Sequence, residues 1–323
     1  MVAQSQIAKD KLNVLLIDID STMPNLALMK LSAYHKQKGD SVIFSHVRKS
    51  TLGLVTHNYE IDKVYISCIF TWNDKLAMKL ARHFAQLGKP VALGGPGHIA
   101  LVPIGLPAGA EHVKPDYSLY GIDYSMGFLS RGCSRGCPFC RVSQLEGSIH
   151  QHSWFDEFLH PNHEKVVLLD NNILMSERWE EALTFLVEKN LKVSICQGFD
   201  ARLIDEKAAK LIAKVKCYDW RFKYPAYYTA WDSIQDEKIV LSGIQNLIDA
   251  GVKARNIRPY VLVGFGTSLE NDLYRFKKLR QLGTYPYVMP FNNRKHPLKR
   301  WGQRPALYKS VPFEEYDPKI EPH

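Results

Sequence analysis

Short apolar runs alternate with amphipathic stretches along the first third of the chain. Residues 13–19 form an apolar run typical of a buried parallel strand, and residues 25–38 carry apolar side chains at helical spacing before Gly39 stops the pattern. Further strands are predicted at residues 41–45, 63–70 and 90–94, with a second helix at residues 74–86. Strands that alternate with helices in this way predict a doubly wound parallel sheet, and therefore an α/β fold.

The same alternation returns after an irregular stretch, residues 103–109, in which proline and glycine recur. A strand that begins at Tyr124 is expected there, and five more follow it at residues 164–169, 192–196, 226–231, 258–263 and 285–291. We place the domain boundary near Gly121. The expected organisation is a first α/β domain at residues 1–120, a second at 121–292, and a basic C-terminal tail at 293–323.

Composition is that of an ordinary globular protein, since 46% of the 323 residues are hydrophobic and 23% are charged. No apolar run reaches membrane-spanning length and residues 1–11 are polar, so we expect a cytoplasmic protein without a membrane partner. Lysine and arginine outnumber aspartate and glutamate by 42 to 33, a net charge of +9. This excess favours an anionic substrate or partner, although a basic surface kept for solubility explains it equally well.

Three of the six cysteines lie within eight residues of one another, in the stretch 127–140. Cys133, Cys137 and Cys140 have the spacing C-x3-C-x2-C, and Gly132 and Gly136 give the backbone the freedom that a sharply turning loop needs. Such a loop suits the thiolate ligands of a four-iron cluster. Three ligands for four irons leave one iron open.

A structural zinc ion is the main alternative for these cysteines. Structural zinc prefers four ligands, usually as two separated pairs. The nearest candidates for a second pair, His150 and His152, have the spacing HxH, which is poor for that purpose. A disulfide framework is disfavoured because the chain is large and shows no secretory signal. Cys68, Cys196 and Cys217 are isolated, and the first two lie in apolar runs typical of buried core thiols.

The motif CxxxCx(aromatic)C, with Phe139 as its aromatic residue, resembles the hallmark of the radical S-adenosylmethionine (SAM) superfamily. The resemblance implies a [4Fe-4S] cluster held by Cys133, Cys137 and Cys140, with the amino and carboxylate groups of SAM on the open iron. It also implies a partial (β/α)6 barrel over residues 121–292, with functional groups at the carboxyl ends of the strands. The resemblance is strong at residues 127–141 and weaker in the first domain.

Polar residues at two predicted strand ends extend this resemblance. Asp170, Asn171 and Asn172 stand where the family has a Gly-Gly-Glu segment that holds the SAM amino group. Arg202 follows the next strand, where the family places a basic residue beside the SAM carboxylate, a planar anion that suits a guanidinium. The sequence departs from Gly-Gly-Glu, and aspartate or asparagine at a strand end also commonly caps the following helix.

Two further strand ends complete the predicted cofactor site. The resemblance places Asp232 where a side chain accepts hydrogen bonds from the ribose hydroxyls of SAM. Gly264 and Gly266, followed by Glu270, resemble the family's GxPxE-type loop, which packs near the adenine. An ordinary turn or cap is the alternative for each of these residues.

The first domain resembles the cobalamin-binding domain that precedes the barrel in one class of the superfamily. A glycine-rich loop, residues 94–98, follows the predicted fourth strand as in that class, and His98 is a candidate ligand. The family's DxHxxG motif is absent, because Asp18 and Asp20 are followed by Ser21 and Thr22 and no histidine. Cobalamin binding is therefore one interpretation, and a degenerate domain used for packing or substrate binding is the other.

The function that the resemblance implies is reductive cleavage of SAM. An electron from a reduced flavodoxin- or ferredoxin-type donor yields methionine and a 5′-deoxyadenosyl radical, which abstracts hydrogen from an unidentified small-molecule substrate. Radical methyl transfer becomes the alternative if cobalamin binds. A rival of another class is a non-catalytic protein, stabilised by zinc or by a cluster, that binds nucleic acid through its basic stretch at residues 294–304.

Overall fold

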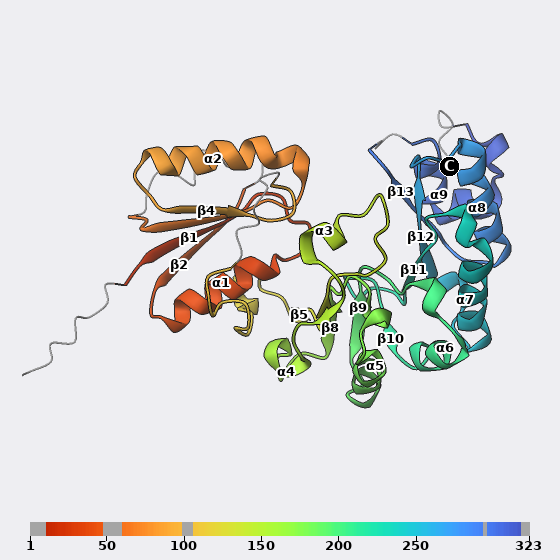
Figure 1. Cartoon of the computed structure of the whole chain (residues 1–323), viewed down its shortest axis with the longest axis horizontal. Helices are drawn as coiled ribbons and strands as arrows, with labels where there is room; N and C mark the ends of the chain where they lie inside the picture. The colour runs from red at the N-terminus through yellow and green to blue at the C-terminus, as the bar shows by residue number, and fades with distance from the viewer. Residues whose placement is uncertain (1–10, 48–59, 99–105, 293–295, 318–323) are drawn as a thin grey trace, which may run out of the picture. The chain divides into compact units, whose positions relative to one another are not determined.

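The computed structural model describes residues 11–47, 60–98, 106–292 and 296–317, and the chain divides into two compact units (Figure 1). Unit 1 comprises residues up to Ser125 together with Asp156–Leu159, and unit 2 comprises Met126–Phe155 and the residues from His160 onward. Arg294 and Lys295, part of the predicted basic stretch, lie outside the described residues. None of the helices in the described ranges has the length and apolar character that a bilayer crossing requires.

Unit 1 is built on a parallel sheet of four strands, with the Rossmann-like order β2-β1-β3-β4. The strands are β1 (Asn13–Asp18), β2 (Ser41–His46), β3 (Lys63–Ser67) and β4 (Val91–Gly94). Two helices connect them, α1 (Leu26–Gln37) and α2 (Asp74–Gln86). The sheet predicted from the apolar runs is thus confirmed, and both predicted helices are present.

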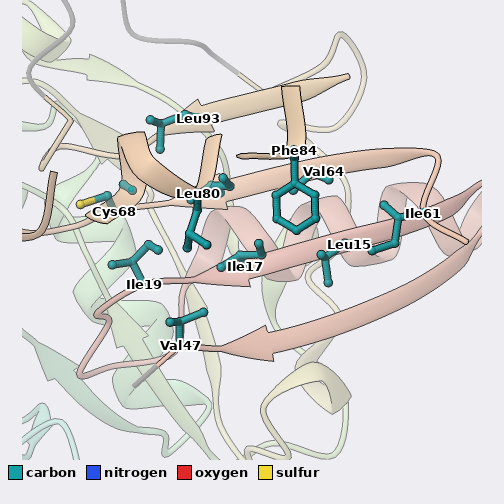
Figure 2. Packing of buried hydrophobic residues seen from close by; sticks show 12 residues of the cluster. Leu15, Ile17, Ile19, Val47, Ile61, Val64, Cys68, Leu80, Phe84 and Leu93 are labelled. Carbon is teal, nitrogen blue, oxygen red and sulfur yellow. The ribbon is translucent and has the colours of Figure 1, made fainter. Parts of the chain in front are cut away.

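The central strand β1 buries both of its faces, which explains its nearly continuous apolar sequence. Leu15 and Ile17 belong to a core cluster that includes Leu80 and Phe84 of α2 (Figure 2). Val14 and Leu16 belong to a second cluster, formed with side chains of α1. Successive side chains of a strand point to opposite faces, so the two clusters place α1 and α2 on opposite sides of the sheet.

Unit 2 contains two parallel sheets rather than one. The first has the order β10-β9-β8-β5 and the second the order β11-β12-β13. The seven strands are β5 (Ser125–Gly127), β8 (Lys165–Leu168), β9 (Lys192–Ile195), β10 (Lys216–Cys217), β11 (Tyr227–Ala230), β12 (Ile257–Val263) and β13 (Tyr287–Pro290). All six predicted strands are present, and β10 is an addition. The described residues show no closed barrel, although Phe199 N donates a hydrogen bond to Tyr228 O (2.8 Å) just beyond the end of β9.

Four longer helices follow the strands of unit 2: α5 (Trp179–Glu188), α6 (Glu206–Ile212), α7 (Glu237–Asp249) and α8 (Leu269–Gln281). Side-chain caps fix where two of them begin. The carboxylate of Asp205 accepts a hydrogen bond from Ala208 N (2.8 Å) at the start of α6, and Ser268 Oγ accepts one from Asn271 N (3.2 Å) at the start of α8. These caps satisfy backbone donors that the first turn of a helix leaves free.

The described part of the C-terminal segment contributes to the core of unit 2. Leu298 and Trp301 of α9 (Leu298–Gly302) and Tyr308 of α10 (Pro305–Ser310) are almost fully buried. Trp301 Nε1 also donates a hydrogen bond to Val311 O (2.8 Å). The apolar residues of this segment therefore stabilise unit 2 by burying surface against α8 and β13.

Candidate functional site

The cysteine loop leaves one strand of a short antiparallel hairpin and returns to the other. The hairpin pairs β6 (Ser130–Arg131) with β7 (His150–Gln151), and α3 (Val142–Glu146) lies on the return path. Gly132 has a φ of +80°, and a Cβ there would lie 2.2 Å from Ser148 O. Cys133 N donates to Gly147 O (3.1 Å), so the two ends of the loop are tied together. Only glycine fits at position 132.

The three cysteines are free and partly exposed. Cys140 N donates to Cys137 O (2.9 Å), which closes a tight turn, and Val142 N donates to Cys140 Sγ (3.5 Å). Burial raises the pKa of Cys137, and the positive charge of Arg202 opposes that rise, while thiolates at Cys140 and Cys133 add to it. The three thiols and one guanidinium are thus close enough for their charges to interact.

In the described part of the chain, no three histidine, cysteine, aspartate or glutamate side chains are grouped as the ligands of one metal ion would be. A single zinc ion requires its sulfur ligands at about 2.3 Å from the metal. The thiolates of an iron–sulfur cluster each bind a different iron atom, so their sulfur atoms stand farther apart.

Asp170 and Asn171, at the end of β8, hold the backbone of the cysteine loop. Asp170 is fully buried and accepts hydrogen bonds from Leu129 N (3.1 Å), Ser130 N (2.6 Å) and Ser130 Oγ (2.7 Å). Burial raises the pKa of Asp170, and these hydrogen bonds oppose the rise. Asn171 Oδ1 accepts a hydrogen bond from Gly132 N (3.0 Å). Both carboxylate oxygens of Asp170 are engaged by the chain itself.

Asn172, the third residue of this segment, has one polar atom without a partner. Its Nδ2 donates to Asp200 Oδ2 (3.1 Å), whereas its Oδ1 is buried and has no hydrogen bond to any described residue. The residue is only 5% exposed. Because an unsatisfied buried acceptor costs about 1–3 kcal/mol, a donor from outside the described chain is expected at this oxygen.

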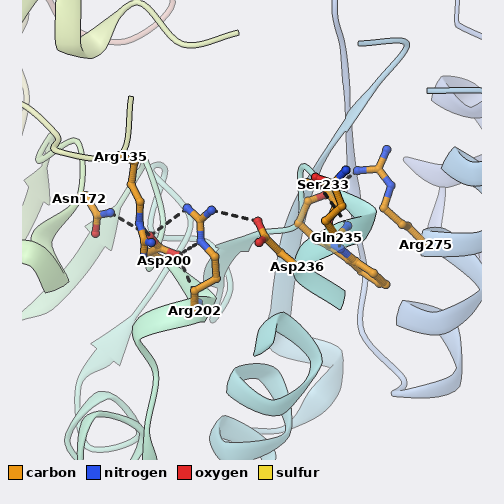
Figure 3. Close-up of polar contacts among 9 residues, drawn as sticks. Arg135, Asn172, Asp200, Arg202, Ser233, Gln235, Asp236 and Arg275 are labelled. Carbon is orange, nitrogen blue, oxygen red and sulfur yellow. Dashed lines mark hydrogen bonds and ion pairs between the residues drawn. The ribbon is translucent and has the colours of Figure 1, made fainter. Parts of the chain in front are cut away.

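Asp200 connects the cysteine loop with the ends of β8 and β9 (Figure 3). Its carboxylate accepts hydrogen bonds from Arg135 Nε (3.0 Å) of the loop, from Asn172, and from Arg202 Nε and Nη2 (2.8 and 3.1 Å). Burial would raise the pKa of Asp200, but the hydrogen bonds and charge of Arg202, the charge of Arg135 and the Asn172 amide outweigh it and hold the pKa below its usual value. Asp200 is not among the site residues predicted from the sequence, where its only signal is its place just after a predicted strand.

Arg202 is engaged at every side-chain nitrogen. Besides its two bonds to Asp200, its Nη1 donates to Asp236 Oδ2 (3.0 Å), and these carboxylates raise its pKa. Arg202 therefore lies beside Cys137 with its charge already balanced by two carboxylates. A ligand carboxylate would have to share this guanidinium with them.

The end of β12 approaches the cysteine loop through aromatic contacts. The ring centroids of Phe139 and Phe265 are 5.5 Å apart, and those of Phe265 and Phe291 are 4.7 Å apart. Phe265 lies between Gly264 and Gly266, which both have positive φ values (76° and 61°). The structure thus brings Phe139 beside the predicted adenine loop.

Buried carboxylates fix the loop after β12 and the end of β11. Asp272 accepts hydrogen bonds from Gly264 N (3.0 Å) and Thr267 Oγ1 (2.7 Å) and pairs with fully buried Arg275 (2.6 Å; Figure 3 shows Arg275). Asp232 accepts one from Leu262 N (3.2 Å), and burial raises its pKa. Glu270 is exposed in the first turn of α8.

In unit 1, the glycine-rich loop after β4 packs closely on the segment after β3. A Cβ at Gly95 would lie 2.3 Å from Cys68 O, and one at Gly97 would lie 2.5 Å from Phe70 N. His98 Nδ1 lies 2.7 Å from Asp74 Oδ1, at the start of α2. The candidate ligand His98 is therefore held by a neighbouring carboxylate.

The isolated cysteines differ in burial. Cys68 and Cys217 are buried, whereas Cys196 is only partly buried, so the expected core position is confirmed for Cys68 and only partly for Cys196. Burial raises the pKa of Cys196 to about 11 and that of Cys68 to about 12. Neither thiol is primed as a nucleophile at neutral pH.

Comparison with known proteins assigns no family to this chain. No model of a known protein family matches the sequence, and no curated protein sequence matches it.

Proposed function

We propose that the chain is a radical SAM enzyme in which Cys133, Cys137 and Cys140 ligate three irons of a [4Fe-4S] cluster. Together, such a cluster and SAM supply one-electron cleavage of SAM to methionine and a 5′-deoxyadenosyl radical, which takes a hydrogen atom from the substrate. The electron comes from a reduced flavodoxin- or ferredoxin-type donor. The role of the chain is to place the thiols on a fixed loop and to surround the site with paired charges.

The observation that carries this proposal is the buried, unpartnered Oδ1 of Asn172 beside the cysteine loop. An ammonium group such as that of SAM can donate the hydrogen bond that this oxygen lacks. Because described residues bury Asn172 Oδ1, we expect its side chain or its neighbours to shift when SAM binds. Asn172 is also tied through Asp200 to Arg135, which lies between Cys133 and Cys137 in the loop. The residues present therefore fit the cofactor that the cysteine spacing implies.

The arrangement of the strands supports a partial (β/α)6 barrel. β5, β8, β9, β11, β12 and β13 occur in chain order, and β8–β9, β11–β12 and β12–β13 pair in parallel. The hydrogen bond from Phe199 N to Tyr228 O links the two sheets between the third and fourth of these strands. In this arrangement the cysteine loop, Asn172, Asp200 and the loop after β12 share the carboxyl edge.

For cobalamin, the described residues of unit 1 offer a poorer fit. Asp18 accepts hydrogen bonds from Tyr120 Oη (2.6 Å) and Ser21 N (3.0 Å), and Asp20 accepts them from Ile69 N (2.8 Å) and Phe70 N (3.1 Å). His98 is bound to Asp74. The polar groups at this edge therefore bind one another, which favours the interpretation of a degenerate domain over a methyltransferase that uses cobalamin.

Anaerobic reconstitution of the full-length protein with iron and sulfide tests the proposal. We expect about four irons and four sulfides per chain, a brown colour, and release of 5′-deoxyadenosine when SAM and dithionite are added. The triple variant C133A/C137A/C140A should hold no cluster, whereas Cys196→Ser should keep it. A triple variant with the parental iron content and activity, or a colourless parent with stoichiometric zinc, would overturn the proposal.

A further inference from the structure

One face of the β11-β12-β13 sheet carries tyrosines, and helices cover the opposite face. Val288 of β13 packs on the side of Phe276 of α8, since a Cβ at Gly302 would lie 2.9 Å from atoms of both residues. Figure 1 shows α8 and α9 on the same side of this sheet. Tyr287 and Met289, which alternate with Val288, are 45% and 43% exposed. The face opposite the helices is therefore open to a ligand at β13.

The tyrosines of this face form a wall with fixed geometry. The rings of Tyr228 and Tyr260 are stacked nearly parallel, with centroids 5.2 Å apart, and Tyr287 meets Tyr260 edge-on at 5.9 Å. Tyr260 Oη donates a hydrogen bond to Cys196 O (2.9 Å), which orients its ring. Burial raises the pKa values of Tyr228 and Tyr260, so both hydroxyls stay neutral. A planar ring can pack on such a wall with little loss of side-chain entropy.

Arg258 stands at the other end of the same face, where no carboxylate of the described residues forms an ion pair with it. It precedes Tyr260 by two residues on β12, and its register partner on β11 is Tyr228. Its guanidinium lies over the rings of Tyr224 (5.2 Å) and Tyr285 (5.4 Å). The Arg258 side chain has no hydrogen bond or ion pair with any described residue, and its Nε is buried. A partly buried guanidinium in this situation favours an anion.

We propose that this face binds an aromatic ring that carries a carboxylate or phosphate, with the ring on Tyr260 and Tyr287 and the anion on Arg258. Arg258 and Tyr260 are two positions apart on the strand, roughly 7 Å, so the anion stands several bonds away from the ring. The opposite end of the face leads through Phe291 and Phe265 to Phe139 of the cysteine loop. That this ligand is the substrate rests on the proposed function.

Equilibrium dialysis with the full-length protein, without iron or SAM, tests this inference. The anionic probes are phenylpropanoate and phenethyl phosphate, and their neutral counterparts are phenylpropanamide and phenethyl alcohol. We expect at least one anionic probe to bind about tenfold more tightly than its counterpart. The preferred probe distinguishes a carboxylate ligand from a phosphate ligand.

Two pairs of variants locate the binding. Arg258→Gln should remove the preference for the anion, whereas Arg255→Gln, a change at an exposed arginine three residues away, should keep it. Tyr287→Ala should weaken the binding of the anionic and neutral probes alike by about threefold to tenfold. Tyr274→Ala, a change at an exposed tyrosine of α8, should leave their binding unchanged.

Equal binding of charged and neutral probes, or an Arg258→Gln protein that keeps the preference, would overturn the inference. Absence of binding by all four probes would do so as well. Since the assay needs no iron, a protein that binds the probes but assembles no cluster would refute the proposed function alone.

Discussion

The two units end their parallel strands in similar polar, glycine-containing loops, but the polar atoms of these loops are paired to different degrees. At the edge of unit 1, Asn25 uses both ends of its amide, accepting from Leu28 N (3.1 Å) and donating to Ser21 Oγ (3.1 Å) and Ser67 Oγ (2.8 Å). At the edge of unit 2, the Asn172 amide bonds to the described residues through Nδ2 and not through Oδ1. The first amide is complete without a ligand, and the second is not.

The comparison indicates how an edge that only supports the fold can be distinguished from one that binds a ligand. Both edges contain buried carboxylates and close backbone contacts at glycine, so neither feature alone marks a binding site. A buried atom without a described partner at such an edge is the stronger indication, because a ligand there can offset its cost of about 1–3 kcal/mol. Away from both edges, His83 Nε2 and Tyr316 Oη also lack a described partner, so the position at the edge is part of the criterion. Matched substitutions in the two units can test this distinction.

The largest effect is expected when a glycine at each edge is replaced by alanine, because the added Cβ clashes with the backbone at both positions. Gly132→Ala and Gly95→Ala each place a Cβ within 2.2 or 2.3 Å of a backbone oxygen, at positive φ values of 80° and 102°. We expect each to lower the free energy of unfolding by about 3 kcal/mol. Iron incorporation per folded chain should fail only for Gly132→Ala. Urea unfolding and iron analysis measure the two quantities.

Gly136→Ala is the control for this pair, because no heavy atom lies within 4 Å of a Cβ built there. It should destabilise the chain less than Gly132→Ala. If Gly132→Ala took up iron like the parent, the loop geometry would not determine cluster binding.

The second comparison removes a carboxylate from each edge. Asp200→Ala leaves Arg135 and Asn172 without their common acceptor, so we expect release of 5′-deoxyadenosine to slow by about 10- to 100-fold. Asp20→Ala also frees three N–H donors, among them Asn73 Nδ2 (2.8 Å), and the Cys68 thiol, but it should cost only stability. Rates measured in reconstituted protein at equal cluster content separate the two outcomes. Equal losses of activity in both variants would contradict the comparison.

The third comparison concerns the two asparagines. Asn172→Ala removes an acceptor that has no partner in the described chain together with one hydrogen bond, from Nδ2 to Asp200, so it should lower the free energy of unfolding by only about 1 kcal/mol, while the KM for SAM rises about tenfold. Asn25→Ala removes three hydrogen bonds and should lower the free energy of unfolding by about 1–3 kcal/mol without any change in that KM. A strongly destabilised Asn172→Ala protein with an unchanged KM would show that the orphan oxygen serves folding alone.

The sequence predicts most of the fold because strands and helices have local patterns of apolar residues. The apolar runs at 13–19 and 258–263 coincide with β1 and β12. The β6–β7 hairpin was missed because two-residue strands carry no periodic signal. Whether the two sheets of unit 2 join depends on contacts between distant segments, such as Phe199 with Tyr228, which no local pattern encodes.

The candidate site likewise has one part that local sequence predicts and another part that contacts between distant residues create. The cysteine spacing is local, so the loop was predictable, including the need for glycine at position 132. Asp200 acquires its role from Arg135 and Asn172, which are 65 and 28 residues away, and its own neighbours in sequence give no hint of them. Asp170 was expected beside a cofactor, yet its oxygens bind backbone and hydroxyl groups of the loop 40 residues upstream.

The smallest predicted effect is a pH dependence near neutral pH that arises in unit 1. Buried His35 lies 2.6 Å from Asp40 through Nδ1 and 3.1 Å from Tyr65 Oη through Nε2. Burial lowers its pKa below the ordinary value of 6.5, although the hydrogen bond and charge of Asp40 oppose this. Between the lowered pKa and 6.5 the unfolded chain binds more protons than the folded chain, so stability rises with pH in that window. The contribution is complete above 6.5 and is lost as the pH falls to the folded value.

Urea unfolding between about pH 5 and 7.5 measures this slope of stability against pH. Trp72 lies in unit 1, so the difference in tryptophan fluorescence between the parent and a Trp72→Phe variant follows the unfolding of that unit. His35→Gln should flatten the slope. Asp40→Asn should extend it to lower pH, because it removes the group that raises the pKa of His35. The pKa of Asp200 lies below its usual 3.8, so the contribution of that carboxylate is present above 3.8 and is lost only in stronger acid. A slope unchanged in both variants would place the titrating group elsewhere.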